Sequence, residues 1–139
     1  MTVGLKHAKL WNQGKGMLGK ISGRWDPMVS CIYWNGKFVT GGSSGNVYAW
    51  GGNTGIPTKG HQGPVDCLAV DERGNLYSGC SKGTIATWKF SGGKLAMDRK
   101  IADVSRFDEV NPGVLSMDFN KDTLLLCTRS SSIYEFSVD

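Results

Sequence analysis

An aromatic residue closes four successive units of this chain, and this spacing constrains the fold more than any other feature. The closing pairs are Leu10-Trp11, Ala49-Trp50, Thr87-Trp88 and Glu135-Phe136. Successive closing aromatics are 39 (11 to 50), 38 (50 to 88) and 48 (88 to 136) residues apart. Each unit holds short apolar runs divided by turn residues, and no helical pattern of useful length is present. A period near 40 with an aromatic end is typical of four-stranded blades arranged around an axis.

The second unit shows the strand order most clearly. Residues 28–34 are nearly all apolar and short, which predicts a buried inner strand. The Asn-Gly pair at 35–36 favours a type I′ hairpin, after which residues 37–40 pair back. Residues 46–50 and 56–59 are the expected third and fourth strands. The third unit, residues 61–100, repeats this order, so we expect an all-β meander.

The repeat divides the chain into four parts. We expect residues 1–24 to be the end of one blade, residues 25–60 and 61–100 to be two blades, and residues 101–139 to be a blade without a clear outer strand. The segment 101–112 is longer than its counterparts, and we expect it to form a surface loop.

Gly-His at 60–61 and the Trp-terminated third strand of the third unit resemble a WD-repeat blade. In that family a His, a Ser or Thr, a turn Asp and the Trp form a buried hydrogen-bond network. The resemblance implies a structural network of His61, Ser78 and Trp88. The turn Asp is missing, and its place in the second, third and fourth units is held by Ser44, Lys82 and Ser130.

Further motifs resemble the echinoderm microtubule-associated protein-like family. Residues 4–11 are similar to its G-x-K-H-x-K-F-W segment, and residues 38–50 and 60–65 resemble its next two blades. Residues 126–133 are similar to a later string, with Cys127 in place of a Gly and Ser130 in place of an Asn. Members of that family are much longer and carry two joined propellers. The resemblance implies tubulin or microtubules as partners, and a place on the cytoskeleton, often in the axoneme of a cilium or flagellum.

Composition narrows the function classes. The net charge is +4, and the basic residues are scattered, with Arg99-Lys100 as the only adjacent pair. A nucleic-acid binder usually shows a basic stripe, so we expect no nucleic-acid partner. No apolar run approaches the roughly 20 residues of a membrane span, and the first residues carry no signal-peptide core. These features predict a soluble intracellular protein without a membrane partner.

Metal and cofactor chemistry finds little support. The four cysteines, Cys31, Cys67, Cys80 and Cys127, form no CxxC pair. Cys31 and Cys67 fall at equivalent positions in two repeats, which favours small buried side chains over disulfides or zinc ligands. The chain holds only two histidines, and a metal or acid–base pair would need them close together with carboxylates nearby. The blade pattern explains His61, and His7 lies at an expected turn, so structural roles are favoured for both. We therefore expect no metal and no cofactor.

Two motifs formally match enzymes. Residues 41–45 fit G-x-S-x-G, but a strand pattern follows where a nucleophile elbow needs a helix, and the pattern recurs at 79–83. Residues 14–19 fit G-x-G-x-x-G without a βαβ pattern around it, so a loop is the better interpretation. The sequence predicts a protein that is not an enzyme and has no catalytic residue.

About three to three and a half blades are present, whereas a closed propeller typically has 4–8. We expect further blades from the same parent chain, or closure by another chain. The candidate partner contacts are Trp34, Lys37 and Phe107, although core packing is the favoured interpretation of Trp34. The leading interpretation is a WD-repeat scaffold associated with microtubules. The alternative is a general WD-repeat adaptor, such as a ubiquitin-ligase substrate receptor or a signalling scaffold.

Overall fold

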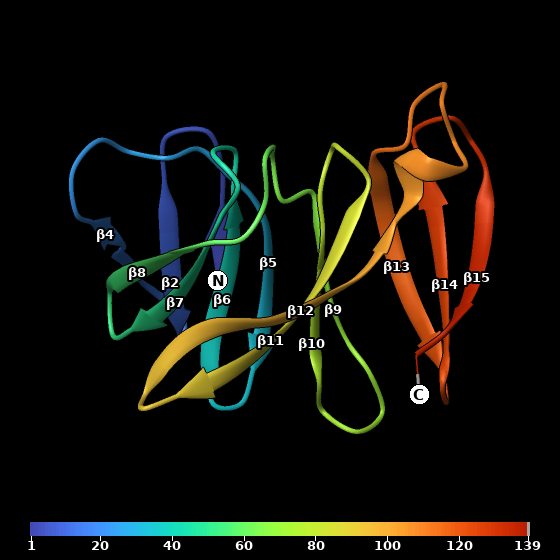
Figure 1. The fold of residues 1–139 in the computed structure, drawn as a ribbon. Coiled ribbons are helices and arrows are strands. Elements are labelled where there is room, and N and C mark those ends of the chain that lie inside the picture. The colour runs from blue at the N-terminus through green and yellow to red at the C-terminus, as the bar shows by residue number, and fades with distance from the viewer. Residues whose placement is uncertain (139) are drawn as a thin grey trace.

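The computed structural model describes residues 1–138, and Figure 1 shows them as an all-β chain. A single 3-10 turn, η1 (Val104–Arg106), is the one helical element in that range. Within residues 1–138, no helix is long and apolar enough to cross a bilayer. The strands are β1 (Thr2–Val3), β2 (Ala8–Asn12), β3 (Lys15–Leu18), β4 (Lys20–Ile21), β5 (Met28–Trp34), β6 (Lys37–Gly42), β7 (Asn46–Gly51), β8 (Thr54–Lys59), β9 (Cys67–Val70), β10 (Leu76–Gly79), β11 (Thr84–Ser91), β12 (Lys94–Asp103), β13 (Val114–Asn120), β14 (Thr123–Thr128) and β15 (Ile133–Ser137).

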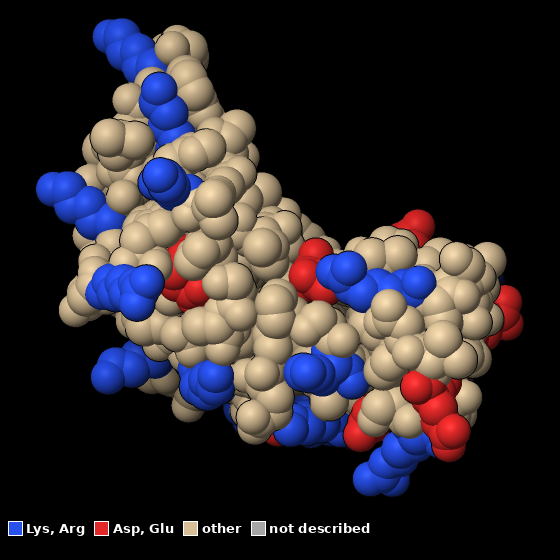
Figure 2. Space-filling model, turned by 90° about the horizontal axis from the view of Figure 1, so that it is seen from above, with Lys and Arg blue, Asp and Glu red and all other residues tan. Residues whose placement is uncertain are grey.

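The strands form four sheets in chain order, which confirms the predicted meander for every strand except β4. The first sheet is β1-β2-β3, the second is β4-β8-β7-β6-β5, the third is β12-β11-β10-β9, and the fourth is β13-β14-β15. All neighbours pair antiparallel except β4, which joins β8 in parallel. Figure 1 shows the sheets standing side by side, and seen from above they make a crescent (Figure 2). The architecture is a partial β-propeller.

Each gap between neighbouring sheets is filled by its own apolar cluster. Between the first and second sheets the cluster is built on Ala8, Met28, Tyr48 and Trp50. Between the second and third sheets it is built on Val39, Val47, Leu76 and Trp88. Between the third and fourth sheets it is built on Tyr77, Ile85, Leu124 and Leu126. Because each sheet alternates its side chains between two faces, an inner sheet contributes to two clusters at once.

The Asn35-Gly36 turn adopts the predicted hairpin geometry. Asn35 has φ 52° and Gly36 has φ 79°. A type I′ turn needs positive φ at both central residues, and its twist matches that of the flanking strands β5 and β6. Residues 43–45 of the G-x-S-x-G match also form a turn, between the strands β6 and β7, with no helix after it.

Residues 15–18, which were expected in a loop, form the strand β3.

The segment 101–112 is not a surface loop throughout. The strand β12 continues to Asp103, and η1 follows with Val104 fully buried in the third cluster. The Asp103 side chain caps this turn by accepting a hydrogen bond from the Ser105 backbone at 3.1 Å. Burial of Val104 ties the connection to the core, so only the stretch after η1 loops out.

The expected equivalence of Cys31 and Cys67 is wrong by one residue. Cys67 pairs with Gly79, whereas the corresponding Gly41 pairs with Ser30. Since a shift of one residue reverses the face of a strand, Cys31 points the other way and is exposed, while Cys67 is buried. All four cysteines are free.

Candidate functional site

His61, Ser78 and Trp88 meet in one hydrogen-bonded network inside the third sheet. The Trp88 Nε1 donates to Ser78 Oγ at 2.7 Å, and Ser78 Oγ lies 2.6 Å from His61 Nε2. All three side chains are buried. Each group is satisfied when the Ser78 hydroxyl donates to His61 Nε2, so that the other ring nitrogen carries the proton.

Thr84 completes this network in place of the missing turn Asp. The His61 Nδ1 lies 2.8 Å from Thr84 Oγ1, which accepts its hydrogen. A hydroxyl acceptor brings no negative charge to stabilise an imidazolium. Burial first, and then the nearby positive charges of Lys100 and Lys59, lower the pKa of His61 to about 4. The ring is therefore neutral at pH 7, as suits a structural element rather than an acid–base catalyst.

The second sheet uses a different centre, the buried carboxylate of Asp26. Its Oδ1 accepts hydrogen bonds from Ser43 Oγ at 3.0 Å and from the Ser44 backbone N–H at 3.1 Å. Its Oδ2 accepts from Ser44 Oγ at 2.5 Å and from the Tyr48 hydroxyl at 2.8 Å. Burial opposes ionisation, but these hydrogen bonds together outweigh it and lower the pKa of Asp26.

The fourth sheet repeats this arrangement around Asp108. Its Oδ2 accepts hydrogen bonds from the hydroxyls of Ser130, of Tyr134 at 3.2 Å and of Thr128 at 3.3 Å. The hydrogen bond from Ser130 is the main cause that lowers the pKa of Asp108. Two of the four sheets therefore hold the turn before their third strand by an acid, a Ser and a Tyr.

Neither acid was predicted from the sequence, although a signal for both exists. Each acid follows an aromatic residue, in Trp25-Asp26 and Phe107-Asp108, in the connection that leads to an inner strand. In each case the bonded Ser and Tyr are four residues apart, at 44 and 48 and at 130 and 134. Comparing the second and fourth units with each other, instead of with the His61 unit, reveals this pattern.

Two of the three candidate contact residues, Trp34 and Lys37, lie beside Phe90 of the third sheet, and Phe107 lies on the fourth sheet. Trp34 is 8% exposed, donates its Nε1 hydrogen to the Gly74 carbonyl at 2.7 Å and stacks on Phe90 at 5.0 Å between ring centroids. Its side chain thus packs between the second and third sheets. Lys37 is exposed beside it, with Nζ 5.3 Å from the Phe90 ring centroid. Phe107 is 47% exposed on the fourth sheet, with its ring edge-to-face on Tyr134.

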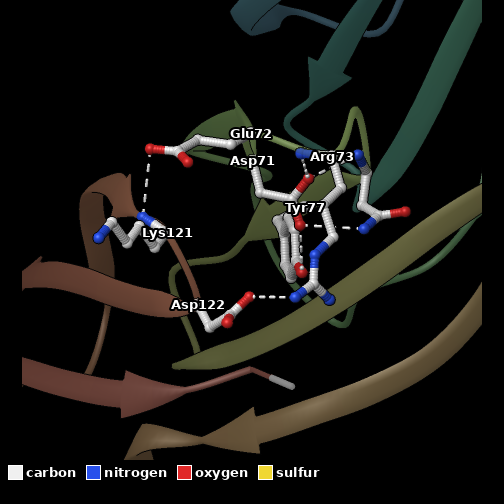
Figure 3. A network of polar contacts seen from close by, with 7 residues as sticks. Asp71, Glu72, Arg73, Tyr77, Lys121 and Asp122 are labelled. Carbon is white, nitrogen blue, oxygen red and sulfur yellow. Dashed lines mark hydrogen bonds and ion pairs between the residues drawn. The ribbon is translucent and has the colours of Figure 1, made fainter.

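A polar network ties the lower turns of the third and fourth sheets, as Figure 3 shows. Arg73 forms an ion pair with Asp122 at 2.6 Å, and the Lys121 backbone N–H donates to Glu72 Oε1 at 3.3 Å. Tyr77 donates its hydroxyl hydrogen to Asp71, which folds the first of these turns back on its own strand. The ion pair is well exposed, so it orients the two turns more than it stabilises them.

Charge is distributed unevenly along the crescent. Residues 1–100 contain thirteen Lys and Arg against five Asp and Glu, whereas residues 101–138 contain three against six. In Figure 2 the blue side chains crowd the left arm, and most red ones lie towards the right, where Figure 1 places β13–β15. The first three sheets are therefore positively charged, and the fourth sheet is negatively charged.

The successive sheets, their intervening cores and the His61–Ser78–Trp88 network define a stretch of WD-repeat β-propeller. A solved structure, the WD40 β-propeller domain of Doa1, superposes with a TM-score of 0.77 at 15% identity, over 99% of this chain and 46% of that one. This likeness shows the fold alone. No protein-family model matches the chain.

The sequence is homologous to proteins named 77 kDa echinoderm microtubule-associated protein. The protein of Lytechinus variegatus is 37% identical over 93 residues, and that of Strongylocentrotus purpuratus is 36% identical over the same length. Each match covers 59% of this chain and 14% of the relative. The resemblance found in the motifs is thus confirmed, and the chain spans about a seventh of those relatives.

Proposed function

We propose that this chain is a non-enzymatic WD-repeat interaction scaffold that associates with microtubules. The observation that carries the proposal is its homology to two proteins that are named as microtubule-associated. The buried polar centres fit this role, because His61 is held neutral and both Asp26 and Asp108 are engaged by hydroxyl donors within the fold. Their polar atoms form hydrogen bonds that hold the turns within the sheets.

The positive surface of the first three sheets is the proposed contact for tubulin. Electrostatic attraction towards a negatively charged partner acts over about 10 Å at 0.1 M salt and speeds association. Lys37, Arg99 and Lys100 are exposed on this surface. The protein would then be located on the cytoskeleton of the cytoplasm, and the axoneme of a cilium or flagellum is the narrower location that we propose.

Co-sedimentation of the full chain with polymerised microtubules tests the proposal. We expect the chain in the pellet at low salt and a weaker association as salt is raised. The double variant Arg99→Glu/Lys100→Glu should bind on the order of tenfold more weakly, because it reverses two exposed charges on the positive surface.

A matched control reverses two exposed cations at the other end of the crescent, Arg106→Glu/Lys121→Glu, and should bind as the unchanged chain does. A chain that remains in the supernatant at low salt contradicts the proposal. If the same preparation captures a ubiquitin ligase or a signalling complex instead, the general adaptor is the better interpretation.

A further inference from the structure

The outward face of the fourth sheet is apolar and uncovered. Leu124 and Leu126 point towards the third sheet and are buried, so the alternating residues of β14 and β15 point away from it. Among these, Leu125 is 41% exposed and Ile133 is 67% exposed. Leu125 pairs across the strands with both Asp118 and Glu135, so two carboxylates border the apolar surface.

The hydrogen-bond register shows what this face corresponds to in the rest of the molecule. The backbone bonds from Cys80 N to Thr84 O and from Thr128 N to Ser132 O close the same turn in the third and fourth sheets. Counting from this turn, Ile133 corresponds to Ile85, and Leu125 corresponds to Tyr77. Ile85 and Tyr77 are buried against the fourth sheet. The open face is therefore the kind of face that elsewhere in this chain is covered by the next sheet.

The outward face of the first sheet is the counterpart. Val3, Ala8 and Leu10 pack towards the second sheet, so Lys9 and Trp11 point away from it. The homologous Trp50 and Trp88 are 2% and 3% exposed, and each packs against the sheet that precedes it.

Trp11, by contrast, is 45% exposed, although its ring is already held in place. Its Nε1 donates to Thr2 Oγ1 at 3.1 Å, and Lys9 Nζ lies 4.4 Å from the ring centroid. Leu18, paired with Lys9 on the same face, is 63% exposed. This face thus presents a pre-oriented indole, an aliphatic side chain and a cation.

The charges of the two faces are complementary. Residues 1–25 carry five Lys and Arg and no Asp or Glu, whereas residues 101–138 carry six acids against three bases. Two first-sheet faces would bring like charges together, and so would two fourth-sheet faces. Only contact between a first sheet and a fourth sheet sets Lys9 against Asp118 and Glu135.

We propose that two copies of this chain associate head to tail, with the outward face of the first sheet in each copy packed on the outward face of the fourth sheet in the other. Such a contact is heterologous, and it closes into a ring only when the rotation fits. The curvature fits two copies, because one chain superposes on 46% of a WD40 propeller domain. In this arrangement a second copy occupies each open face, and the product is a closed pair.

Sedimentation velocity over a series of concentrations tests this association. We expect a dimer that dissociates on dilution and weakens as salt is raised, because opposite charges contribute to the contact. Trp11→Asp and Ile133→Asp each bury a charge in one of the two faces. Each variant alone should associate about tenfold or more weakly than the unchanged chain.

An equimolar mixture of the two variants gives the decisive result. The Trp11→Asp copy keeps an intact fourth-sheet face, and the Ile133→Asp copy keeps an intact first-sheet face, so together they should form a 1:1 dimer through one contact. A mixture that stays monomeric, or single variants that dimerise as well as the unchanged chain, would overturn the head-to-tail arrangement. So would an unchanged chain that is monomeric at every concentration.

Ile56→Asp is the matched control, because Ile56 is 58% exposed on β8, away from both faces. This variant should dimerise like the unchanged chain. Circular dichroism of every variant checks the fold, and Lys9→Glu replaces Trp11→Asp should the latter lose its β signal. Binding to microtubules does not enter these measurements, so failure of the dimer and failure of the proposed function are distinguishable.

Discussion

Tyr48 donates its hydroxyl hydrogen to the Oδ2 atom of Asp26 at 2.8 Å. Asp26 lies 22 residues before Tyr48 in the chain, so this contact joins the strand β7 to the connection that precedes β5. Tyr134 and Asp108 form the corresponding contact in the fourth sheet at 3.2 Å. Because the same contact occurs in two sheets, we infer that the acid has a structural role. It holds the turn between the second and third strands of its sheet.

Removal of the Asp26 carboxylate should therefore destabilise the chain. Asp26→Ala leaves the hydroxyls of Ser43, Ser44 and Tyr48 without their shared acceptor in a mostly buried place. Hydrogen bonds to charged groups contribute about 1.5–3 kcal/mol each, and stranded donors can turn partly to water, so we expect a loss of about 2–4 kcal/mol in the free energy of unfolding. Urea unfolding followed by tryptophan fluorescence measures it.

The control for this measurement is Glu109→Ala, because Glu109 is exposed in the connection between η1 and β13 and lies in neither proposed contact face. Its effect should stay within about 0.5 kcal/mol. Equal losses for the two variants would show that Asp26 has no special structural task.

Ser78→Ala should destabilise the chain more than Thr40→Val, the corresponding change in the second sheet. Ser78 Oγ serves both Trp88 and His61, so its loss leaves two buried groups unpaired, at about 1–3 kcal/mol each. Thr40→Val, at the corresponding position, leaves one buried N–H, that of Trp50, without its acceptor. Thermal unfolding of the two variants should show the larger fall in melting temperature for Ser78→Ala, and the reverse order would contradict the network.

The sheets could be predicted from sequence because their signals are local. Alternating apolar residues and turn pairs such as Asn35-Gly36 act over a few residues, and the structure keeps nearly every expected strand within two or three positions. The third sheet's network could be anticipated only through a family resemblance. Its last member, Thr84, was missed because a hydroxyl one residue after the turn Gly carries no distinctive pattern.

The two acid centres were hidden for a different reason. One residue separates Asp26 from its inner strand at Met28, three separate His61 from Val65, and five separate Asp108 from Val114. Connections of unequal length destroy the spacing on which a repeat comparison depends. The buried state of Trp34 was equally non-local, because it depends on the Gly74 carbonyl and the Phe90 ring of the next sheet.

His61 should make the stability depend on pH between about 6.5 and 4. Its pKa is about 4 in the folded chain against 6.5 for the free side chain, so the unfolded chain binds a proton first as pH falls. The contribution of His61 to the free energy of unfolding is fully present above pH 6.5. It is lost as pH falls to about 4, by about 3 kcal/mol for a pKa shift of this size.

Urea unfolding at half-unit pH steps measures this decrease. His61→Gln should be less stable than the unchanged chain at pH 7 and should lack most of the decrease between pH 6.5 and 4. His7→Gln, at an exposed histidine, should retain it. A decrease that persists undiminished in His61→Gln would assign the proton to another group.

Below about pH 4 the two acid centres should contribute to the loss of stability, together with Asp71, whose pKa is also lowered by hydrogen bonds from Asn75 and Tyr77. Hydrogen bonds from Ser and Tyr hydroxyls lower the pKa of Asp26 and of Asp108 from the ordinary value of 3.8. The unfolded chain therefore takes up these two protons at a higher pH than the folded chain does. Their contribution is complete above the unfolded pKa and is lost as pH falls through the lower folded values.

The double variant Asp26→Asn/Asp108→Asn should be less stable at pH 7, because each amide replaces one acceptor oxygen by a donor that faces hydroxyl groups. Its stability should change less than that of the unchanged chain between pH 4 and 2.5. Acid unfolding curves followed by circular dichroism compare the two, with Glu109→Gln as the control at an exposed carboxylate. A double variant that loses stability as steeply as the unchanged chain would place the acid sensitivity outside these two centres.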